Sequence, residues 1–375
     1  MQYRQLGSSG LLVSTLTLGT LGWGGTGKAG ATGQVDLEGA RRQIGLARDA
    51  GVNIIDTADI YSDGLAEEIL GKALGNDRDE VLIATKVRMP MGDRPNDAGL
   101  SRHHIVRAVE ASLRRLGTDH IDLYQVHAWD GQTPLEETLG ALDLLVRSGK
   151  VRYIGASNYA GWHLMKALAV SDRGALERFV SQQIYYSLHD RDAESELVPV
   201  SIDQGVGILV WSPLSGGLLS GKYRRGVPAP AGSRHLTEWN EPPVHDENRL
   251  YEIIETLVRI GEKHEVAAAP IALAYLLAKP AVTSVILGAR TEDQLAHNLV
   301  AAEITLSNEE IAQLDAVSAQ PLRYPYWHQA HTISDRMSDA DLNLLRPSST
   351  GWEWQHEHRL ELLRDAAPGE FLSKA

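Results

Sequence analysis

The stretch Val52-Asn53-Ile54-Ile55-Asp56-Thr57-Ala58-Asp59-Ile60-Tyr61 decides the fold, because it joins a short apolar run directly to an acid and a phenol. A short run rich in Val and Ile is typical of a buried β-strand. Two later runs end in the same manner, since Val81–Thr85 precedes Lys86 and Ile121–Val126 precedes His127. The sequence therefore places reactive side chains where predicted strands end.

Short apolar, β-branched runs recur eight times, and helix-like segments separate them. Strands that are apolar throughout are covered on both faces, and their alternation with helices indicates a parallel sheet. Eight such units over about 285 residues predict a single (β/α)8 TIM barrel, an α/β fold in which all strand carboxyl ends open onto one face. The predicted strands are Leu16–Leu18, Asn53–Ile55, Val81–Ala84, Ile121–Gln125, Tyr153–Gly155, Phe179–Gln182, Gly207–Trp211 and Ser284–Leu287.

Helix signals occur between the predicted strands. Thr133-Pro134-Leu135-Glu136 combines an N-cap hydroxyl, a first-turn proline and a capping-box glutamate. Leu139, Leu142 and Val146 continue at helical spacing, and a second helix is predicted to follow Ser101. Each helix would bury one apolar stripe against the strands.

An open doubly wound sheet is the structural alternative. The cluster Gly22-Trp23-Gly24-Gly25-Thr26-Gly27 follows the first strand but leads into a polar stretch, so it is interpreted as a loop and not as a dinucleotide-binding turn. Residues 1–306 are therefore interpreted as the barrel, with Leu6–Leu11 in a hairpin that closes its other end. A Pro/Gly-rich insertion after the seventh strand, from Ser212 to about Asp246, and a C-terminal extension over residues 307–375 lie outside the repeat, and the extension is expected to pack on the barrel.

Composition restricts the partners of the chain. It has 375 residues, is 43% hydrophobic and carries a formal charge of −13, which disfavours nucleic acid and acidic membranes because both require clustered Lys and Arg. It contains no cysteine, and no apolar run approaches the ~18 residues that span a bilayer. The N-terminal residues Met1–Leu6 lack a secretory core. We expect a cytoplasmic protein that acts on a small molecule, as a monomer or a homo-oligomer.

The side chains at the strand ends suit the reduction of a carbonyl. Hydride transfer to a carbonyl creates an alkoxide, which needs a proton donor and a stabilising group. Tyr61 could supply the proton if the Lys86 ammonium lowers its pKa from the usual ~10. Asp56 would hold the ammonium, and His127 would donate to the carbonyl oxygen and orient it.

In order and position, the stretches Ile55–Tyr61, Ala84–Lys86 and Tyr124–His127 resemble the aldo-keto reductases. The resemblance extends roughly from Tyr3 to Leu306. It implies reduction of an aldehyde or ketone with NADPH as the cofactor. The catalytic tetrad that it implies is Asp56, Tyr61, Lys86 and His127.

The same resemblance implies a set of cofactor contacts at the strand ends. Ser157 and Asn158 would contact the nicotinamide carboxamide with Gln182, Trp211 would stack on the nicotinamide ring, and Arg290 would bind the 2′-phosphate. The whole implied set is Gly19, Thr20, Leu21, Asp56, Ser157, Asn158, Gln182, Trp211, Ser212, Pro213, Leu214, Gly288, Arg290, Gln294 and Asn298.

Substrate contacts are expected from rings near the same face. In the family the segment after the barrel folds back across the strand exits, which would bring the extension to the pocket. The expected substrate residues are Trp23, Tyr61, His127, Trp129, Tyr326 and Trp327. The substrate is left open among sugars, steroids, reactive aldehydes and other natural-product carbonyls.

Other polar residues are interpreted as structural. Asp59 and Glu67-Glu68 are expected to be turn and helix-surface charges, and His103-His104 a solvated helix start. The stretch His356-Glu357-His358 is interpreted as surface, so no metal site is expected. Ser157-Asn158 is expected to cap the following helix in addition to any cofactor contact.

Two functions from other classes compete with an NADPH-dependent reductase. One is an NADPH-binding regulatory subunit that senses redox state without significant turnover, like the channel-associated members of the family. The other is a metal-dependent barrel isomerase or hydrolase, which would need several His, Asp and Glu at the strand ends. Apart from Asp56 and His127, the sequence supplies Lys, Asn, Gln and Trp there.

Overall fold

Eight parallel strands close into a barrel in the computed structural model, which describes residues 1–26, 33–236, 241–332 and 336–345. The strand order around the barrel is β10-β3-β4-β5-β6-β7-β8-β9. The strands are β3 (Leu16–Gly19), β4 (Ile54–Asp56), β5 (Leu82–Val87), β6 (Ile121–Val126), β7 (Val151–Ser157), β8 (Ser181–Tyr185), β9 (Gly207–Trp211) and β10 (Val282–Leu287). The predicted TIM barrel is therefore confirmed, and each predicted strand overlaps an observed one.

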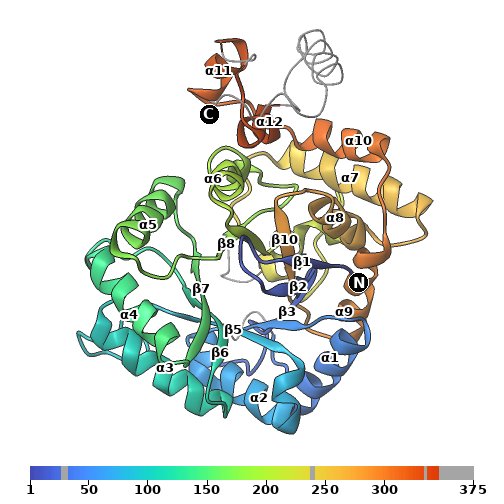
Figure 1. Cartoon of the computed structure of the whole chain (residues 1–375). Coiled ribbons are helices and arrows are strands. Elements are labelled where there is room, and N and C mark those ends of the chain that lie inside the picture. The colour runs from blue at the N-terminus through green and yellow to red at the C-terminus, as the bar shows by residue number, and fades with distance from the viewer. Residues whose placement is uncertain (27–32, 237–240, 333–335, 346–375) are drawn as a thin grey trace. The chain divides into compact units, whose positions relative to one another are not determined.

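Helices lie around the outside of the barrel (Figure 1). They are α1 (Leu37–Asp49), α2 (Leu65–Leu74), α3 (Arg102–Leu116), α4 (Leu135–Arg147), α5 (Gly161–Gly174), α6 (Leu197–Gln204), α7 (Glu247–Lys263), α8 (Ala268–Leu277), α9 (Glu292–Leu299) and α10 (Asn308–Ser318). Ser101 caps α3 as expected, since its side chain accepts a hydrogen bond from the backbone N–H of His104. The capping box predicted at Thr133 is wrong. Pro134 occupies that position at α4, and the Thr133 hydroxyl donates to Asp130 instead.

A two-stranded hairpin closes the end of the barrel opposite the strand exits, as predicted. Its strands β1 (Tyr3–Gln5) and β2 (Leu12–Ser14) pair in antiparallel fashion and lie over the middle of the barrel end in Figure 1. Gly7 allows the close approach, because a Cβ there would lie 2.4 Å from the Val180 carbonyl oxygen, and its φ is +60°. Leu6 and Val13 of the hairpin form one buried cluster with inward side chains of the strands, namely Ile54, Ala84, Leu123, Leu209 and Ile286.

The chain divides into two compact units, Met1–Ala319 and Gln320–Ala375. Helix α10 packs against α7 within the first unit, although the sequence analysis placed the border after Leu306. In the second unit, α11 (Tyr326–Thr332) and α12 (Asp339–Leu345) share a small cluster in which Tyr326 packs with Met337 and Leu344.

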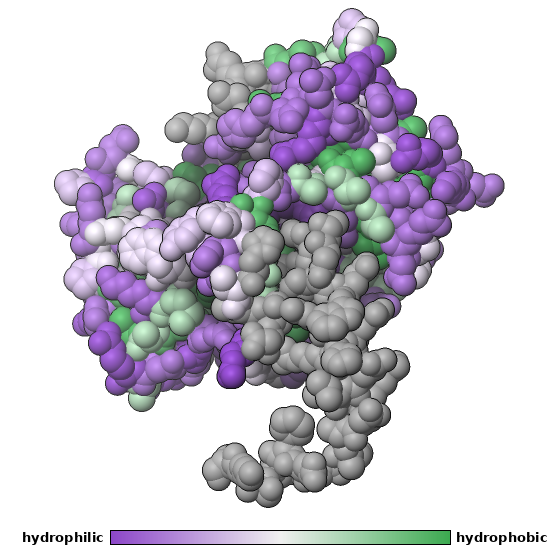
Figure 2. Space-filling view, turned by 90° about the horizontal axis from the view of Figure 1, so that it is seen from above, coloured by the Kyte–Doolittle hydropathy of each residue, from purple (hydrophilic) through white to green (hydrophobic). Residues whose placement is uncertain are grey.

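The surface differs sharply in character from the core. Hydrophilic side chains predominate on the face seen in Figure 2, and hydrophobic ones lie among them in separate patches. The core is mainly aliphatic and surrounds the strands. Among the described residues, no helix is both long and apolar enough to cross a membrane.

Candidate active site

Four side chains that the sequence analysis selected meet at the strand exits. Asp56 is the last residue of β4, Lys86 lies near the end of β5, and His127 follows β6 directly. Lys86 Nζ donates to Asp56 Oδ2 at 2.6 Å and lies 3.1 Å from Tyr61 Oη. It also donates to the backbone oxygen of Thr57 at 2.8 Å. Because an ammonium has three N–H groups, these three contacts use all of them and fix its position.

Two amides that the sequence analysis missed hold the Asp56 carboxylate. Gln183 Nε2 donates to Asp56 Oδ1 at 2.7 Å and Gln125 Nε2 at 3.2 Å. Asp56 is 3% exposed and Lys86 is fully buried, so the ion pair depends on such partners for its remaining acceptor sites. Gly155 on β7 makes room for this layer, since a Cβ there would lie 2.5 Å from Ser181 Oγ and 3.2 Å from Gln125 Cγ.

The ionisation of Tyr61 differs from the expectation. Burial raises the pKa of Tyr61 above 10.0, and the Lys86 charge opposes this rise without reversing it. Burial also works against the charge of Lys86, but Asp56 and Tyr61 together hold the pKa of Lys86 above its usual value. The structure therefore keeps Lys86 charged and Tyr61 protonated, which is the state that a proton donor requires.

His127 lies beside the phenol with its imidazole uncharged. Its ring centroid is 5.9 Å from that of Tyr61, in an edge-to-face arrangement. Burial lowers the pKa of His127 well below 6.5, and the charges of Lys86 and Arg88 lower it further. Its Nδ1 is buried and has no hydrogen-bond partner within the part of the chain that the structure describes. A neutral imidazole keeps one N–H, which can donate to a carbonyl oxygen.

Asn158, after β7, and Trp211, at the end of β9, lie together across the exit of β8. Asn158 Nδ2 donates to the His127 backbone oxygen at 2.9 Å, and its Oδ1 accepts from Trp211 Nε1 at 3.0 Å. Asn158 has a φ of +53°, so the chain turns here and α5 begins only at Gly161. The expectation that Ser157-Asn158 caps this helix is therefore wrong. The Ser157 hydroxyl is buried without a hydrogen-bond partner among the described residues.

On β8 the side chain that reaches the cluster is Gln183 and not Gln182. Gln182 is on the opposite face of the strand, and its amide donates to the Tyr159 backbone oxygen at 3.2 Å. Successive side chains of a strand point to opposite faces. Our assignment of the β8 contact therefore moves by one residue, from Gln182 to Gln183.

The remaining cofactor candidates lie at the exits of β3, β9 and β10. Gly19 ends β3, and the hydroxyl of the neighbouring Thr20 is buried without a partner among the described residues. Arg290 donates from Nη1 to the Gly232 backbone oxygen at 2.8 Å, and its own backbone N–H donates to Gln294. A Cβ added at Gly288 would have no neighbouring atom within 4 Å. The other candidates are Leu21, which follows Thr20, the turn Ser212, Pro213 and Leu214 after β9, and Asn298 on α9.

The substrate candidates separate into three groups. Trp23 is fully buried and donates its indole N–H to Gln43 at 2.9 Å, so it belongs to the core and the expected substrate contact is wrong. Trp129 follows His127 by two residues and stacks on His163, with ring centroids 4.0 Å apart and an angle of 4° between the rings. Tyr326 and Trp327 lie in the second unit, and their contact with a substrate stays a prediction.

Two acids that the sequence analysis placed on the surface are buried. Asp59 and Glu67 are both 0% exposed. Glu67 accepts from Thr85 at 2.5 Å and from Arg115 at 2.7 Å. Burial, and then the charge of Glu67, raise the pKa of Asp59 well above 3.8. These acids form a polar layer behind the tetrad that no periodicity in the sequence indicated.

The histidine interpretations have different outcomes. His104 is 4% exposed, so it is not the solvated helix start that was expected. The stretch 356–358 lies outside the described residues. Within the described ranges, no group of three or more His, Cys, Asp or Glu side chains could hold a metal ion.

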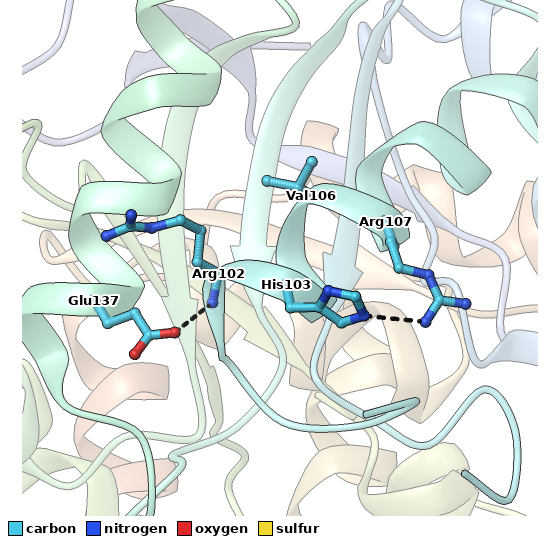
Figure 3. A pocket seen from close by; sticks show the side chains of 5 residues that line it. All are labelled: Arg102, His103, Val106, Arg107 and Glu137. Carbon is cyan, nitrogen blue, oxygen red and sulfur yellow. Dashed lines mark hydrogen bonds between the residues drawn. The ribbon is translucent and has the colours of Figure 1, made fainter. Parts of the chain in front are cut away.

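An open hollow lies between the start of α3 and α4 (Figure 3). Its lining residues are Arg102, His103, Val106, Arg107 and Glu137. Their polar groups bind one another, since Glu137 accepts from the backbone N–H of Arg102 at 2.9 Å and Arg107 contacts His103 at 3.4 Å. None of the proposed catalytic or cofactor residues lines it, so it plays no part in the assignment.

Comparison with known proteins matches residues 15–319 to the model of the Aldo/keto reductase family. The uncharacterized oxidoreductase YrpG of Bacillus subtilis is 41% identical over 333 residues, which are 86% of this chain and 97% of that protein. A probable voltage-gated potassium channel subunit beta of Arabidopsis thaliana is 36% identical over 81% of this chain and 92% of its own length. The versiconal hemiacetal acetate reductase of Aspergillus parasiticus is 34% identical over 84% of this chain and 96% of its own length.

Proposed function

Because the chain belongs to the aldo/keto reductase family, we propose that it reduces an aldehyde or ketone to an alcohol, with NADPH as the hydride donor and Tyr61 as the proton donor. Members of this family are oxidoreductases that act on small carbonyl compounds with a nicotinamide cofactor. The single observation that carries the proposal is the position of Lys86 Nζ, 2.6 Å from Asp56 and 3.1 Å from the Tyr61 hydroxyl. A purely structural ion pair has no need of the phenol.

Each tetrad side chain has a part in the proposed reaction. Lys86 stays charged between Asp56 and Tyr61, so its field stabilises the phenolate that forms when Tyr61 gives up its proton. Asp56 keeps the ammonium in place through its bonds to Lys86 and the two amides. His127, held neutral, donates to the carbonyl oxygen and stabilises the charge that develops there. A proton passes from Tyr61 Oη to that oxygen as the C–O bond becomes single.

The strand exits beside the tetrad fit a nicotinamide. When bound, this cofactor supplies the hydride. An amide needs both donors and acceptors, and the buried Ser157 hydroxyl, the Asn158 amide and Gln183 offer both kinds. Trp211 is half-buried, its indole N–H donates to Asn158, and the face of its ring suits stacking on the nicotinamide ring. On the β10 side, Arg290 with Gln294 suits the adenosine 2′-phosphate, because a guanidinium binds phosphate with several donors.

An NADPH-binding regulatory subunit without significant turnover is the second candidate. The similarity to proteins named as potassium channel beta subunits favours it. The similarity to a protein named as a reductase, the versiconal hemiacetal acetate reductase, favours turnover. So does the geometry of Lys86, because all three N–H groups of its ammonium are directed at acceptors, one of which is the Tyr61 hydroxyl. Both candidates require cofactor binding, so turnover separates them.

The test is the steady-state oxidation of NADPH with sugar, steroid, aromatic and aliphatic carbonyls by the wild type and by Tyr61→Phe. Removal of the hydroxyl should lower turnover on the best substrate by ~10² to 10⁴, the usual contribution of a positioned acid. Quenching of protein fluorescence should show nearly unchanged NADPH affinity. More than about a tenth of wild-type turnover in Tyr61→Phe would remove Tyr61 from the mechanism.

A further inference from the structure

Arg88, at the exit of β5, has a backbone conformation that an arginine rarely adopts. Its φ is +131°, a value that favours glycine. Neighbouring hydrogen bonds hold the chain in this conformation, since the Gly99 N–H donates to the Arg88 oxygen at 2.9 Å and the His127 N–H donates to the Val87 oxygen at 2.8 Å. Backbone strain of this kind persists where the surrounding structure enforces it, and it concentrates at ligand sites.

The guanidinium of Arg88 has little to bind within the protein. Its Nε is buried and has no hydrogen-bond partner in the described ranges, and its Nη1 contacts only the thioether of Met89, at 3.7 Å. A sulfur is a weak acceptor for a full positive charge. The chain carries 49 acidic residues against 36 Lys and Arg, so an arginine without an acidic partner in a partly buried position is a costly choice.

Asp130, whose charge acts on Tyr159 as that of Arg88 does, is already bound elsewhere. Asp130 accepts hydrogen bonds from the backbone N–H groups of Leu100, Gln132 and Thr133 and from the Thr133 hydroxyl. Burial by itself would raise the pKa of Asp130. These hydrogen bonds stabilise the charged carboxylate more strongly, so the pKa of Asp130 is lowered. The Asp130 carboxylate therefore stabilises its own loop and leaves the guanidinium available.

Arg88 lies close enough to His127 and to Tyr159 for its charge to act on both. Burial and the charge of Lys86 lower the pKa of His127, and the charge of Arg88 lowers it further. Burial raises the pKa of Tyr159, while the charge of Arg88 opposes the rise. Tyr159 packs edge to face on Trp129, with ring centroids 5.2 Å apart, and Trp129 stacks on His163. A flat substrate could lie along these rings.

We propose that Arg88 binds an oxyanion of the carboxylate kind on the carbonyl substrate, so that the preferred aldehyde or ketone carries a negative charge away from its reacting carbon. The inference rests on the proposed function, since it names the substrate class of the same site. A guanidinium binds a carboxylate through two parallel N–H groups, which would satisfy the buried Nε together with one terminal nitrogen.

The test compares two aromatic aldehydes that differ in charge, 4-carboxybenzaldehyde and methyl 4-formylbenzoate. The measured quantity is the ratio of kcat/KM for the acid to kcat/KM for the ester, with NADPH, in the wild type, Arg88→Met and Arg94→Met. Arg94 is the matched control, because it lies on the same loop with its side chain 82% exposed. The ratio should fall about 10- to 150-fold in Arg88→Met, the value of one charge-assisted hydrogen bond, and stay at the wild-type value in Arg94→Met.

Two further measurements keep structural and cofactor effects apart from substrate binding. Arg88→Gly relieves the backbone strain, so its Tm should equal or exceed that of Arg94→Met while the preference for the acid is lost. The dissociation constant of NADPH should be the same in all variants. An unchanged acid-to-ester ratio in Arg88→Met and Arg88→Gly would overturn the inference, and so would a loss of NADPH affinity of similar size.

Failure of the proposed function has a different signature. If the wild type reduces neither these two aldehydes nor any other carbonyl of the wider panel, the reductase assignment fails. Whenever the two aldehydes are not reduced, binding of 4-(hydroxymethyl)benzoate, measured by quenching of tryptophan fluorescence, decides the inference. A dissociation constant at least about 10-fold higher in Arg88→Met than in Arg94→Met supports an oxyanion site. Equal constants in the two variants overturn it.

Discussion

Lys86 combines full burial with a full charge. Each of its three N–H groups has an acceptor, and the acceptors are of three kinds: a carboxylate, a backbone oxygen and a phenol. Removal of such a partner leaves the other charge buried and unpaired, which typically costs about 3–5 kcal/mol. The ammonium cannot turn to another acceptor without giving up one of these, so the phenol is held in a defined field.

The pH dependence of the reaction follows from two opposite pKa displacements. The pKa of His127 lies well below 6.5 and that of Tyr61 above 10.0, in both cases chiefly through burial. The neutral imidazole and the protonated phenol therefore coexist between these values. We expect kcat/KM for reduction, which reports the free enzyme, to stay level from pH 6.5 to 10.0 and to fall above that range.

Incubation at each pH followed by assay at neutral pH is the control for denaturation. A fall in kcat/KM that begins between pH 7 and 9 and is reversible in this control would mean that Lys86 lowers the pKa of Tyr61 more than burial raises it, as the sequence alone suggested, and would contradict the structural assignment.

Arg290 makes a separate prediction about cofactor choice. Its guanidinium reaches the Gly232 oxygen, and its backbone is held by Gln294. A charge-assisted bond to a 2′-phosphate is worth roughly 1.5–3 kcal/mol. Arg290→Ala should therefore weaken NADPH binding about 10- to 150-fold and leave NADH binding nearly unchanged. Fluorescence titration with both cofactors measures this, and equal losses for the two would give Arg290 a role in the loop alone.

At the scale of the element, strand β8 tests the correction from Gln182 to Gln183. Gln183→Met removes one of the two amides on Asp56, so turnover should fall by about 10-fold, the equivalent of one hydrogen bond of about 1.4 kcal/mol. Gln182→Met removes a bond to the Tyr159 backbone on the outer face, so it should lower stability by about 1 kcal/mol and leave kcat almost unaltered.

The two substitutions are matched in chemistry and adjacent in sequence, so each serves as the control for the other. Steady-state kinetics should show the larger loss of turnover in Gln183→Met, and denaturant unfolding should show the larger loss of stability in Gln182→Met. A larger loss of turnover in Gln182→Met would mean that Gln182, and not Gln183, is the β8 side chain that points toward Asp56.

Strands could be predicted from the sequence because buried parallel strands are continuously apolar. The tetrad followed, since Asp56, Lys86 and His127 end three such runs. In a strand that is buried on both sides, the same signal does not show which side chains point into the barrel and which point outward. For this reason the contact on β8 was assigned to Gln182, although Gln183 makes it. It also gives no information about distant partners, so the pairing of Trp23 with Gln43 was missed.

Buried acids were missed for a related reason. Asp59 and Glu67 look like surface charges, because the sequence does not show that Thr85 and Arg115 come from other elements to meet Glu67. Thr133 failed as a cap because Asp130, three residues earlier, competes for its hydroxyl. No sequence pattern indicates a role for Arg88, because the feature that distinguishes it is its backbone conformation.

At the scale of the whole molecule, the border at Ala319 predicts which parts can be separated. The barrel unit Met1–Ala319 contains the tetrad, the cofactor candidates and α10. Its last helix is fixed by Arg191, which is 5% exposed in its side chain and pairs with Asp315 at 3.0 Å. A chain that ends at Ala319 should therefore fold and bind NADPH.

The same truncation tests the expected substrate role of Tyr326 and Trp327. The Michaelis constant for the carbonyl substrate should rise far more than the NADPH dissociation constant, because the lost segment is expected to line the substrate side only. A Tm close to that of the full chain is the control for folding. Unchanged kinetics in a folded truncated protein would exclude the second unit from the site.

The hairpin at the far end of the barrel also determines by which end small molecules can enter and leave. Leu6 and Val13 pack with the inward side chains of the strands at the base of the barrel. The barrel is therefore closed at this end and open at the strand exits. In the proposed reaction, the alcohol and the oxidised cofactor would leave through the same rim by which the carbonyl compound and NADPH enter. Turnover in that reaction would therefore include the time needed for product release, and the loops around the rim, in which Arg88 and Trp129 lie, would border the path of both entry and release.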